Sequence, residues 1–377
     1  MDFGLSEEQQ TLQRTARVLL AAECPPQLVR DVAESEDGVP RALYRTLADL
    51  GWFSMLVPEH AGGLGLETLD LALIMEELGR VTAPGPFLST QLVIAALLRG
   101  GSARQRRTWL RRFMDGTAFG ALVHHESAGG AAPRDNAPRA RRTRTGYTLD
   151  GTVRLVLDAA AADVLLVAAR PRAARRPPGI SLFLVEADAP GVRIRRHRGL
   201  DLSRRLADVQ LRDVAVPAEA RLGRDGEASA LLERLLDLAA VGVAADSLGG
   251  AQQTLDMAVE YAKVREQFGR SIGSFQAIKH IAAEMVADVE PARSLVWYAA
   301  YVQDHGPRER RRLASMAKAS LSDVYSRTAR RSVEIHGGIG FTWEFDLHLW
   351  FKRAHLSESL FGDAAHHRER IAQLDRY

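Results

Sequence analysis

The sequence predicts an α+β protein with a helical first third, a middle antiparallel β-barrel domain and a C-terminal four-helix bundle. Three observations lead to this prediction. Apolar residues recur with helical spacing in the first third, short apolar runs separated by Gly, Pro, Asp and Arg begin at about residue 119, and long helical patterns return at about residue 227. We therefore expect three domains, over residues 1–118, 119–225 and 226–377.

The first domain is predicted to begin with a capped helix. Ser6 and Gln9 have the spacing of a capping box, and apolar residues follow at helical spacing. Glu76 and Glu77 are expected on the solvent face of a later helix. The further helices are predicted over residues 41–50, 69–78, 88–98 and 103–114.

The middle domain is predicted to consist of short strands. Val192–Ile194 and Val209–Leu211 alternate apolar and polar residues with a period of two, which is typical of half-buried antiparallel strands. Ile180–Val185 is a continuous apolar run. The segment Arg170–Pro178, rich in Arg and Pro, is expected to be an exposed hairpin loop.

The last domain is predicted to be a bundle of long helices. Glycine and proline interrupt the helical pattern at residues 269–273, 306–307 and 337–338. The helices are expected over residues 227–265, 275–305, 308–337 and 347–374.

The composition excludes several classes of protein. Cys24 is the only cysteine, so the chain forms no internal disulfide and no cysteine-based zinc site, and we expect a reducing, cytoplasmic compartment. The 50 basic and 47 acidic residues are interleaved, which indicates a solvated arginine-rich surface and not nucleic-acid binding. No apolar stretch of about 18 residues predicts a membrane span. The histidines lack the acid partners and spacing of a metal site.

Three continuous motifs stand out in the sequence, YAKVREQFGRSIGSFQAIKH at 261–280, EIHGGIGFT at 334–342 and LRDVAVP at 211–217. They resemble motifs of the acyl-CoA dehydrogenase superfamily. The resemblance covers essentially the whole chain and has the same order of helices, strands and helices. It implies FAD as the cofactor, an acyl-CoA or acyl-carrier-protein thioester as the substrate, an electron-transfer acceptor, and at least a dimer.

The resemblance also implies which residues contact FAD. In the family, the groups corresponding to Arg265, Phe268, Gln276 and Gly337–Gly338 reach the FAD of the neighbouring subunit. The chemistry is suitable, because an Arg fork matches phosphate oxygens, Phe offers an aromatic face, Gln can donate and accept, and Gly permits close approach of the backbone.

Other positions depart from the family pattern. The loop that resembles the family's flavin-holding loop is His124–Ala131, so His125 and Glu126 become the candidate flavin contacts. The run Leu155–Asp158 lacks the Trp and Thr that many members keep beside the flavin ring. Glu334 replaces a glutamine on the pyrophosphate side, where a carboxylate is unfavourable unless it has another partner.

The catalytic base is the largest departure. Dehydrogenation removes a proton from the α-carbon of the thioester, which requires a positioned carboxylate. The resemblance places Phe361 and Ala239 at the two positions where members keep a glutamate. The remaining candidates are Asp246, in an apolar helix segment expected to raise its pKa, and Asp363. Alternatively, Asp246 is an aspartate that packs between helices, and Asp363 caps the last helix.

Three functions stay open at this point. The first is FAD-dependent α,β-dehydrogenation of an acyl thioester by this chain. The second is a non-catalytic or half-site subunit of a heteromeric acyl-CoA dehydrogenase, in a heterotetramer instead of a homo-oligomer. The third is a flavin-dependent oxygenase on the same fold, which needs no α-carbon base.

Overall fold

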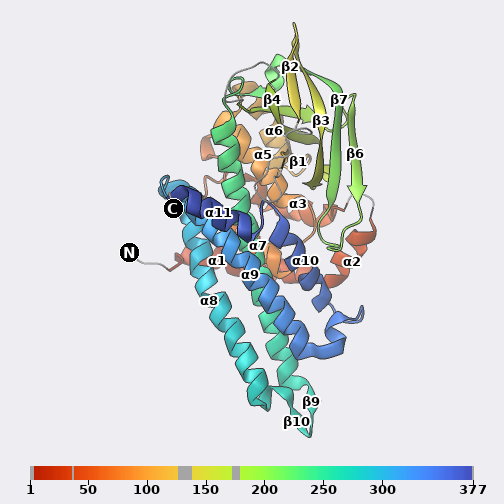
Figure 1. Cartoon of the computed structure of the whole chain (residues 1–377), viewed down its shortest axis with the longest axis vertical. Helices are drawn as coiled ribbons and strands as arrows, with labels where there is room; N and C mark the ends of the chain where they lie inside the picture. Colours follow the sequence, from red (N-terminus) through yellow and green to blue (C-terminus); the bar gives the residue numbers. More distant parts are fainter. Residues whose placement is uncertain (1–3, 36–37, 126–137, 172–178, 376–377) are drawn as a thin grey trace.

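A computed structural model describes residues 4–35, 38–125, 138–171 and 179–375, and Figure 1 shows the whole chain. The first third is helical, as predicted. The capping box at Ser6 and Gln9 is confirmed, since each residue's side chain accepts a hydrogen bond from the other's backbone N–H. The helices are α1 (Glu7–Glu23), α2 (Pro26–Glu34), α3 (Arg41–Asp49), α4 (Thr68–Arg80), α5 (Phe87–Gly100) and α6 (Ala103–Met114).

The prediction that Glu76 and Glu77 face solvent is wrong, because α4 is buried on nearly all sides. Glu77 accepts two hydrogen bonds from Arg17, at 2.7 and 3.0 Å. Glu76 is paired with Arg293 of a C-terminal helix. The prediction from helical spacing assumed that water solvates these carboxylates, whereas arginines from other helices pair with them.

The middle third forms a mixed sheet with the strand order β6-β7-β3-β2-β4-β5-β8, and β1 also pairs with β4. β1 and β2 both run parallel to β4, and the end strands β6 and β8 do not pair. The expected antiparallel barrel is therefore corrected to a sheet that does not close within the described residues. Alternation of apolar residues indicates the buried face of a strand, but not the direction of its neighbour. The strands are β1 (Gly120–Val123), β2 (Arg139–Arg142), β3 (Gly146–Leu157), β4 (Val164–Pro171), β5 (Ser181–Glu186), β6 (Val192–His197), β7 (Leu206–Pro217) and β8 (Arg221–Leu222).

The last third is a helical bundle, as predicted. The expected fourth helix is in fact two, because the chain turns at Leu360–Asp363. A small hairpin, β9 (Glu266–Gln267) and β10 (Arg270–Ser271), follows the first helix of this last third and lies at the lower end of Figure 1. The helices are α7 (Ser229–Val264), α8 (Gln276–His305), α9 (Arg310–His336), α10 (Leu347–Ser359) and α11 (Ala364–Asp375). None of the helices in the described residues is long and apolar enough to span a bilayer.

The helices α4 and α7 cross in very close contact, and this crossing positions the candidate site. A Cβ on Gly79 would lie 1.9 Å from the backbone oxygen of Asp246, and one on Gly249 would lie 1.7 Å from that of Glu76. Only glycine permits this approach. The crossing buries Asp246 in the middle of the molecule, where α10 and the β6–β7 connection also meet α7.

Candidate active site and cofactor groove

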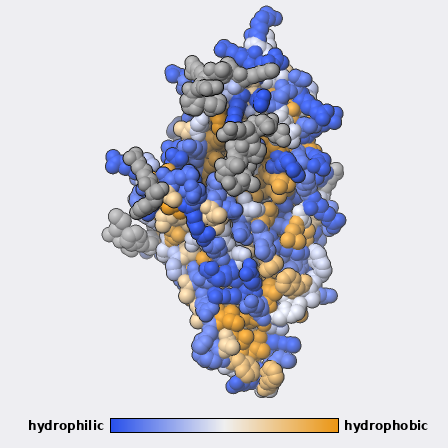
Figure 2. All heavy atoms as spheres, in the orientation of Figure 1, coloured by the Kyte–Doolittle hydropathy of each residue, from blue (hydrophilic) through white to orange (hydrophobic). Residues whose placement is uncertain are grey.

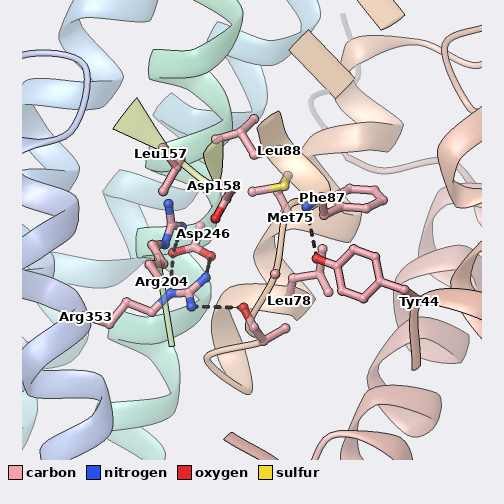
Figure 3. Close-up of a pocket in the computed structure, with 12 residues that line it drawn as sticks. Tyr44, Met75, Leu78, Phe87, Leu88, Leu157, Asp158, Arg204, Asp246 and Arg353 are labelled. Carbon is pink, nitrogen blue, oxygen red and sulfur yellow. Dashed lines mark hydrogen bonds and ion pairs between the residues drawn. The ribbon is translucent and has the colours of Figure 1, made fainter. Parts of the chain in front are cut away.

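A small cavity lies where the three parts of the chain meet (Figure 3). Its volume is about 20 Å³, which is room for one water molecule. One wall is apolar and the other carries charged side chains. The lining residues are Tyr44, Met75, Leu78, Ala83, Gly85, Phe87, Leu88, Leu157, Asp158, Arg204, Asp246 and Arg353.

Asp246 lies beside this cavity between two buried arginines. Arg353 of α10 forms a two-point ion pair with its carboxylate, with the Nε–Oδ2 distance at 3.1 Å. Arg204, from the β6–β7 connection, approaches the same Oδ2 at 3.0 Å. Arg353 also donates to the backbone oxygen of Ala83 and to Ser203 Oγ, so this ion cluster joins all three parts of the chain.

The expected pKa shift of Asp246 is wrong in direction. Burial alone raises the pKa of this carboxyl, but the positive charges of Arg204 and Arg353 outweigh burial, and the pKa is lowered. A carboxylate held in this way is a weak proton acceptor. The sequence pattern showed the apolar helix around Asp246, but it could not show two arginines from distant segments.

Asp158 is the second carboxylate on the cavity, and sequence reasoning did not select it. Its Oδ2 accepts a hydrogen bond from Ser89 Oγ at 2.5 Å, and its backbone is left-handed, with φ of 57°. Burial raises its pKa to about 6, although Ser89 and the nearby arginines oppose this shift. The available signal was an acid within the run Leu155–Asp158, which the resemblance places beside the flavin ring.

Phe361, which the resemblance places at the base position, is held firmly in a tight turn. Its backbone is left-handed, with φ of 56°, and its oxygen faces His367 Nε2 at 3.0 Å. Lys318, fully buried, donates to the backbone oxygens of Glu358 and Gly362 at 3.0 and 2.9 Å. The ring stacks on His124 with 5.7 Å between centroids and 5° between planes. Burial lowers the pKa of His124 to about 4, so this stack is neutral at pH 7.

Two of the three remaining candidates, Asp363 and His125, are in the described part of the chain, and neither lines the cavity. Asp363 is exposed, and its Oδ1 accepts from the backbone N–H of His366 in the first turn of α11, as a helix cap does. His125 is the second residue after β1 and is half-buried. Glu126 lies outside the described residues.

Three of the predicted FAD contacts gather around the β9–β10 hairpin. Arg265 follows α7, Gln276 begins α8, and Phe268 lies at the tip of the hairpin. Phe268 is 93% exposed and has a φ of 53°. An exposed aromatic residue in a left-handed conformation is unfavourable by itself and is typical of a binding site. Arg265 forms no ion pair with a described carboxylate, so its guanidinium is available to an anion.

Gly337 and Gly338 lie beside the last turn of α7. The ring of His336 stacks on Tyr261, four residues before Arg265, with centroids 4.3 Å apart. A Cβ built on either glycine would meet no atom within 4 Å, so the backbone there is open to a ligand or another chain. Glu334 is exposed in the last turn of α9. The structure therefore brings the predicted dinucleotide contacts to one end of the bundle.

The same end of the molecule carries exposed apolar side chains. Figure 2 shows hydrophobic residues gathered at the lower end of the view, where β9–β10 and the adjoining ends of α7 and α8 lie in Figure 1. Val264 is 74% exposed beside Phe268. Phe341 and Trp343, after the glycine pair, are 59% and 61% exposed. Exposed apolar groups gathered in this way are typical of a protein interface.

Family models match all three parts of the chain. The acyl-CoA dehydrogenase N-terminal domain matches residues 6–117, the middle domain matches 121–214, and the C-terminal domain matches 229–374.

Known proteins and solved structures are similar over the full length. Acyl-CoA dehydrogenase IpdE2 of Mycolicibacterium smegmatis is 32% identical, covering 98% of this chain and 99% of that protein. A chain of the ChsE4-ChsE5 complex from Mycobacterium tuberculosis is 30% identical with a TM-score of 0.89, covering 99% of this chain and 98% of that chain. Butyryl-CoA dehydrogenase from Megasphaera elsdenii is 27% identical with a TM-score of 0.91, and both chains are covered completely.

Proposed function

Because this chain belongs to the acyl-CoA dehydrogenase family, we propose that it serves the FAD-dependent α,β-dehydrogenation of an acyl-CoA thioester. We further propose that it does so as one half of a heteromeric enzyme. In this arrangement its β9–β10 end completes the FAD site of a second acyl-CoA dehydrogenase-like chain, which carries the catalytic base. The solved ChsE4-ChsE5 complex supports this arrangement, because it contains a similar chain beside a different one.

The proposal rests on a contrast between the residues suited to bind FAD, which are open, and the position of the catalytic base, which is filled. The groups suited to a dinucleotide phosphate, Arg265 and Gly337–Gly338, are exposed and open. The base position of this chain is instead filled by an aromatic ring, because Phe361 stacks on the buried His124. Neither of these two side chains accepts a proton from carbon at the position where the family keeps a glutamate.

Bound FAD supplies the hydride acceptor of the reaction. The residues of this chain contribute binding. Arg265 presents a permanently charged fork to phosphate oxygens, Phe268 covers an aromatic ring, and Gln276 can hydrogen-bond a polar edge. Glu334 opposes an anion unless a group of the partner neutralises it, so we expect a cation of the partner beside it.

A second candidate is turnover by this chain alone, and the raised pKa of the buried Asp158, which suits a general base, favours it. In that case the base is one of the two carboxylates on the cavity. Asp246 is tied to two arginines, whereas Asp158 has a neutral partner in Ser89. Asp363 takes no part, since it does not line the cavity.

The experiment is to purify the chain alone and together with its coexpressed partner, and then to follow FAD content and thioester-dependent bleaching. Arg265→Ala in this chain is expected to lower FAD retention in the complex by about tenfold to a hundredfold, the weight of about 1.5–3 kcal/mol for a charge-assisted contact. Lys263→Ala is the matched control, because Lys263 is an exposed cation two residues earlier that pairs with Glu260.

Unchanged FAD content in Arg265→Ala would refute the proposed contact between Arg265 and FAD. Bleaching by a thioester in the chain alone overturns the half-site role and favours the second candidate. Oxygen uptake by the flavin-loaded complex that requires an added reductant such as NAD(P)H, without bleaching by a thioester, identifies an oxygenase.

A further inference from the structure

We propose that the cavity between α4, α5, α7 and α8 binds a phosphate group through Arg99 and Arg234. This site is separate from the proposed FAD contacts around the β9–β10 hairpin, which lie at the other end of α7. The lining residues are Thr68, Ala95, Arg99, Arg234, Leu235, Leu238 and Gln303.

The two arginines are cations without a partner among the described residues. Arg99 is in the last turn of α5, and Arg234 is in the second turn of α7. Neither guanidinium forms an ion pair or a hydrogen bond with a described side chain or backbone group. On the other cavity, by contrast, both lining arginines, Arg204 and Arg353, are paired with Asp246.

Asp304 of α8 and Asp237 of α7, which lie next to lining residues in the sequence, already have partners. Asp304 accepts a hydrogen bond from the backbone N–H of Thr68 at 2.8 Å, at the start of α4. Asp237 serves both Arg310, at 3.1 Å, and Arg370, at 2.6 Å. Positive charge therefore exceeds negative charge around the cavity, and an anion would restore the balance.

The two arginines affect one another electrically. The pKa of Arg99 is lowered, first by partial burial and then by the positive charge of Arg234, whereas Asp304 opposes this shift. This repulsion is unfavourable in the free protein. A bound anion removes it and so gains more from these two groups than from two isolated surface arginines.

A phosphate monoester is the anion that fits best. It carries close to two negative charges at pH 7 and at least three acceptor oxygens, so it can neutralise two guanidiniums at once. A single carboxylate would leave one cation unmatched. The enclosed part of the cavity measures about 10 Å³, room for about one water, so the phosphate lies at the mouth, where Arg99 is exposed.

The test titrates the full chain, with its partner where the two copurify, with inorganic phosphate at constant ionic strength. Isothermal calorimetry gives the dissociation constant. Arg234→Gln and Arg99→Gln are each expected to weaken binding by about tenfold or more. Arg107→Gln is the matched control, because Arg107 is an exposed arginine of α6 that does not line the cavity, and it is expected to leave binding unchanged.

Two further ligands identify the source of the phosphate. Coenzyme A carries a phosphate monoester that dephospho-coenzyme A lacks. A preference for coenzyme A that disappears in Arg234→Gln assigns the site to that group. Binding of inorganic phosphate that is weakened in Arg234→Gln, with no preference for coenzyme A over dephospho-coenzyme A, assigns it to a free phosphate. The proposal is overturned if phosphate binds no better than chloride, or if Arg107→Gln weakens binding as much as Arg234→Gln. Phosphorus NMR line broadening gives the same comparison if a variant is too dilute for calorimetry.

Discussion

Replacing Asp246 by Asn tests whether this residue holds the fold together or performs catalysis. The substitution keeps the shape of the side chain and removes its charge. It leaves Arg204 and Arg353, which are 6% and 4% exposed at their side chains, without their shared counter-ion. Breaking a buried ion pair by removing one partner costs about 3–5 kcal/mol. We expect Asp246→Asn to lower the free energy of unfolding by this amount at pH 7.

The loss should depend on pH in a defined direction. The pKa of Asp246 is lowered in the folded protein from its ordinary value of 3.8. The stabilisation is therefore fully present above pH 3.8 and is lost as the pH falls through the folded pKa. The difference between wild type and variant should be constant from pH 5 to 8 and should shrink only in strong acid.

The assay is urea unfolding followed by circular dichroism, with Asp115→Asn as the control. Asp115 is 53% exposed and pairs with Arg111 on the surface of α6, so its loss should cost no more than about 0.5 kcal/mol. The reasoning is refuted if Asp246→Asn unfolds like the wild type while its rate of dehydrogenation falls by about a hundredfold. That result would make Asp246 a base, with little structural role.

Three other substitutions probe buried groups. Asp158→Asn should stabilise the protein by about 1–3 kcal/mol at pH 8 and by nothing near pH 4. The reason is that the folded pKa of about 6 makes the wild type lose stability as the pH rises from 4 to 6. Free energies of unfolding measured from pH 4 to 8 check this, and a difference between variant and wild type that does not change with pH would contradict it. Lys318→Met should destabilise by about 2–4 kcal/mol, since two backbone oxygens of the Phe361 turn lose their donor; a melting temperature equal to that of the wild type would count against this. Glu77→Ala should cost about 1.5–3 kcal/mol because it removes the two charge-assisted hydrogen bonds from Arg17, whereas Arg80 keeps its ion pair with Asp256, and a loss below about 1 kcal/mol in urea would disprove it.

The sequence predicted the order of helices, strands and helices because the period of apolar residues changes from 3.6 to 2 and back. It also predicted breaks in the helical pattern at residues 269–273 and 337–338, where the structure has the end of the β9–β10 hairpin and the end of α9. The direction of β1 was not predictable, because a parallel neighbour such as β4 is set by chain topology and not by alternation.

The charged interior was the least predictable part. Glu76 and Asp246 each pair with an arginine that is distant in sequence, Arg293 and Arg353. From a helical pattern alone, a charged residue is expected either to face solvent or to lie in an apolar environment that raises its pKa. Only knowledge of its ion-pair partner changes that expectation. Sequence spacing therefore found the place of Asp246 in the fold and missed its electrostatic state.

The central claim is that this chain supplies half of a shared FAD site, and the flavin absorbance spectrum tests it most directly. The spectrum is measured on the chain purified alone and on its complex with the coexpressed partner. We predict less than stoichiometric FAD in the chain alone, and stoichiometric FAD in the complex that is lost on Arg265→Ala but retained in Lys263→Ala. Stoichiometric FAD in the chain alone, bleached by an acyl-CoA, would contradict the claim.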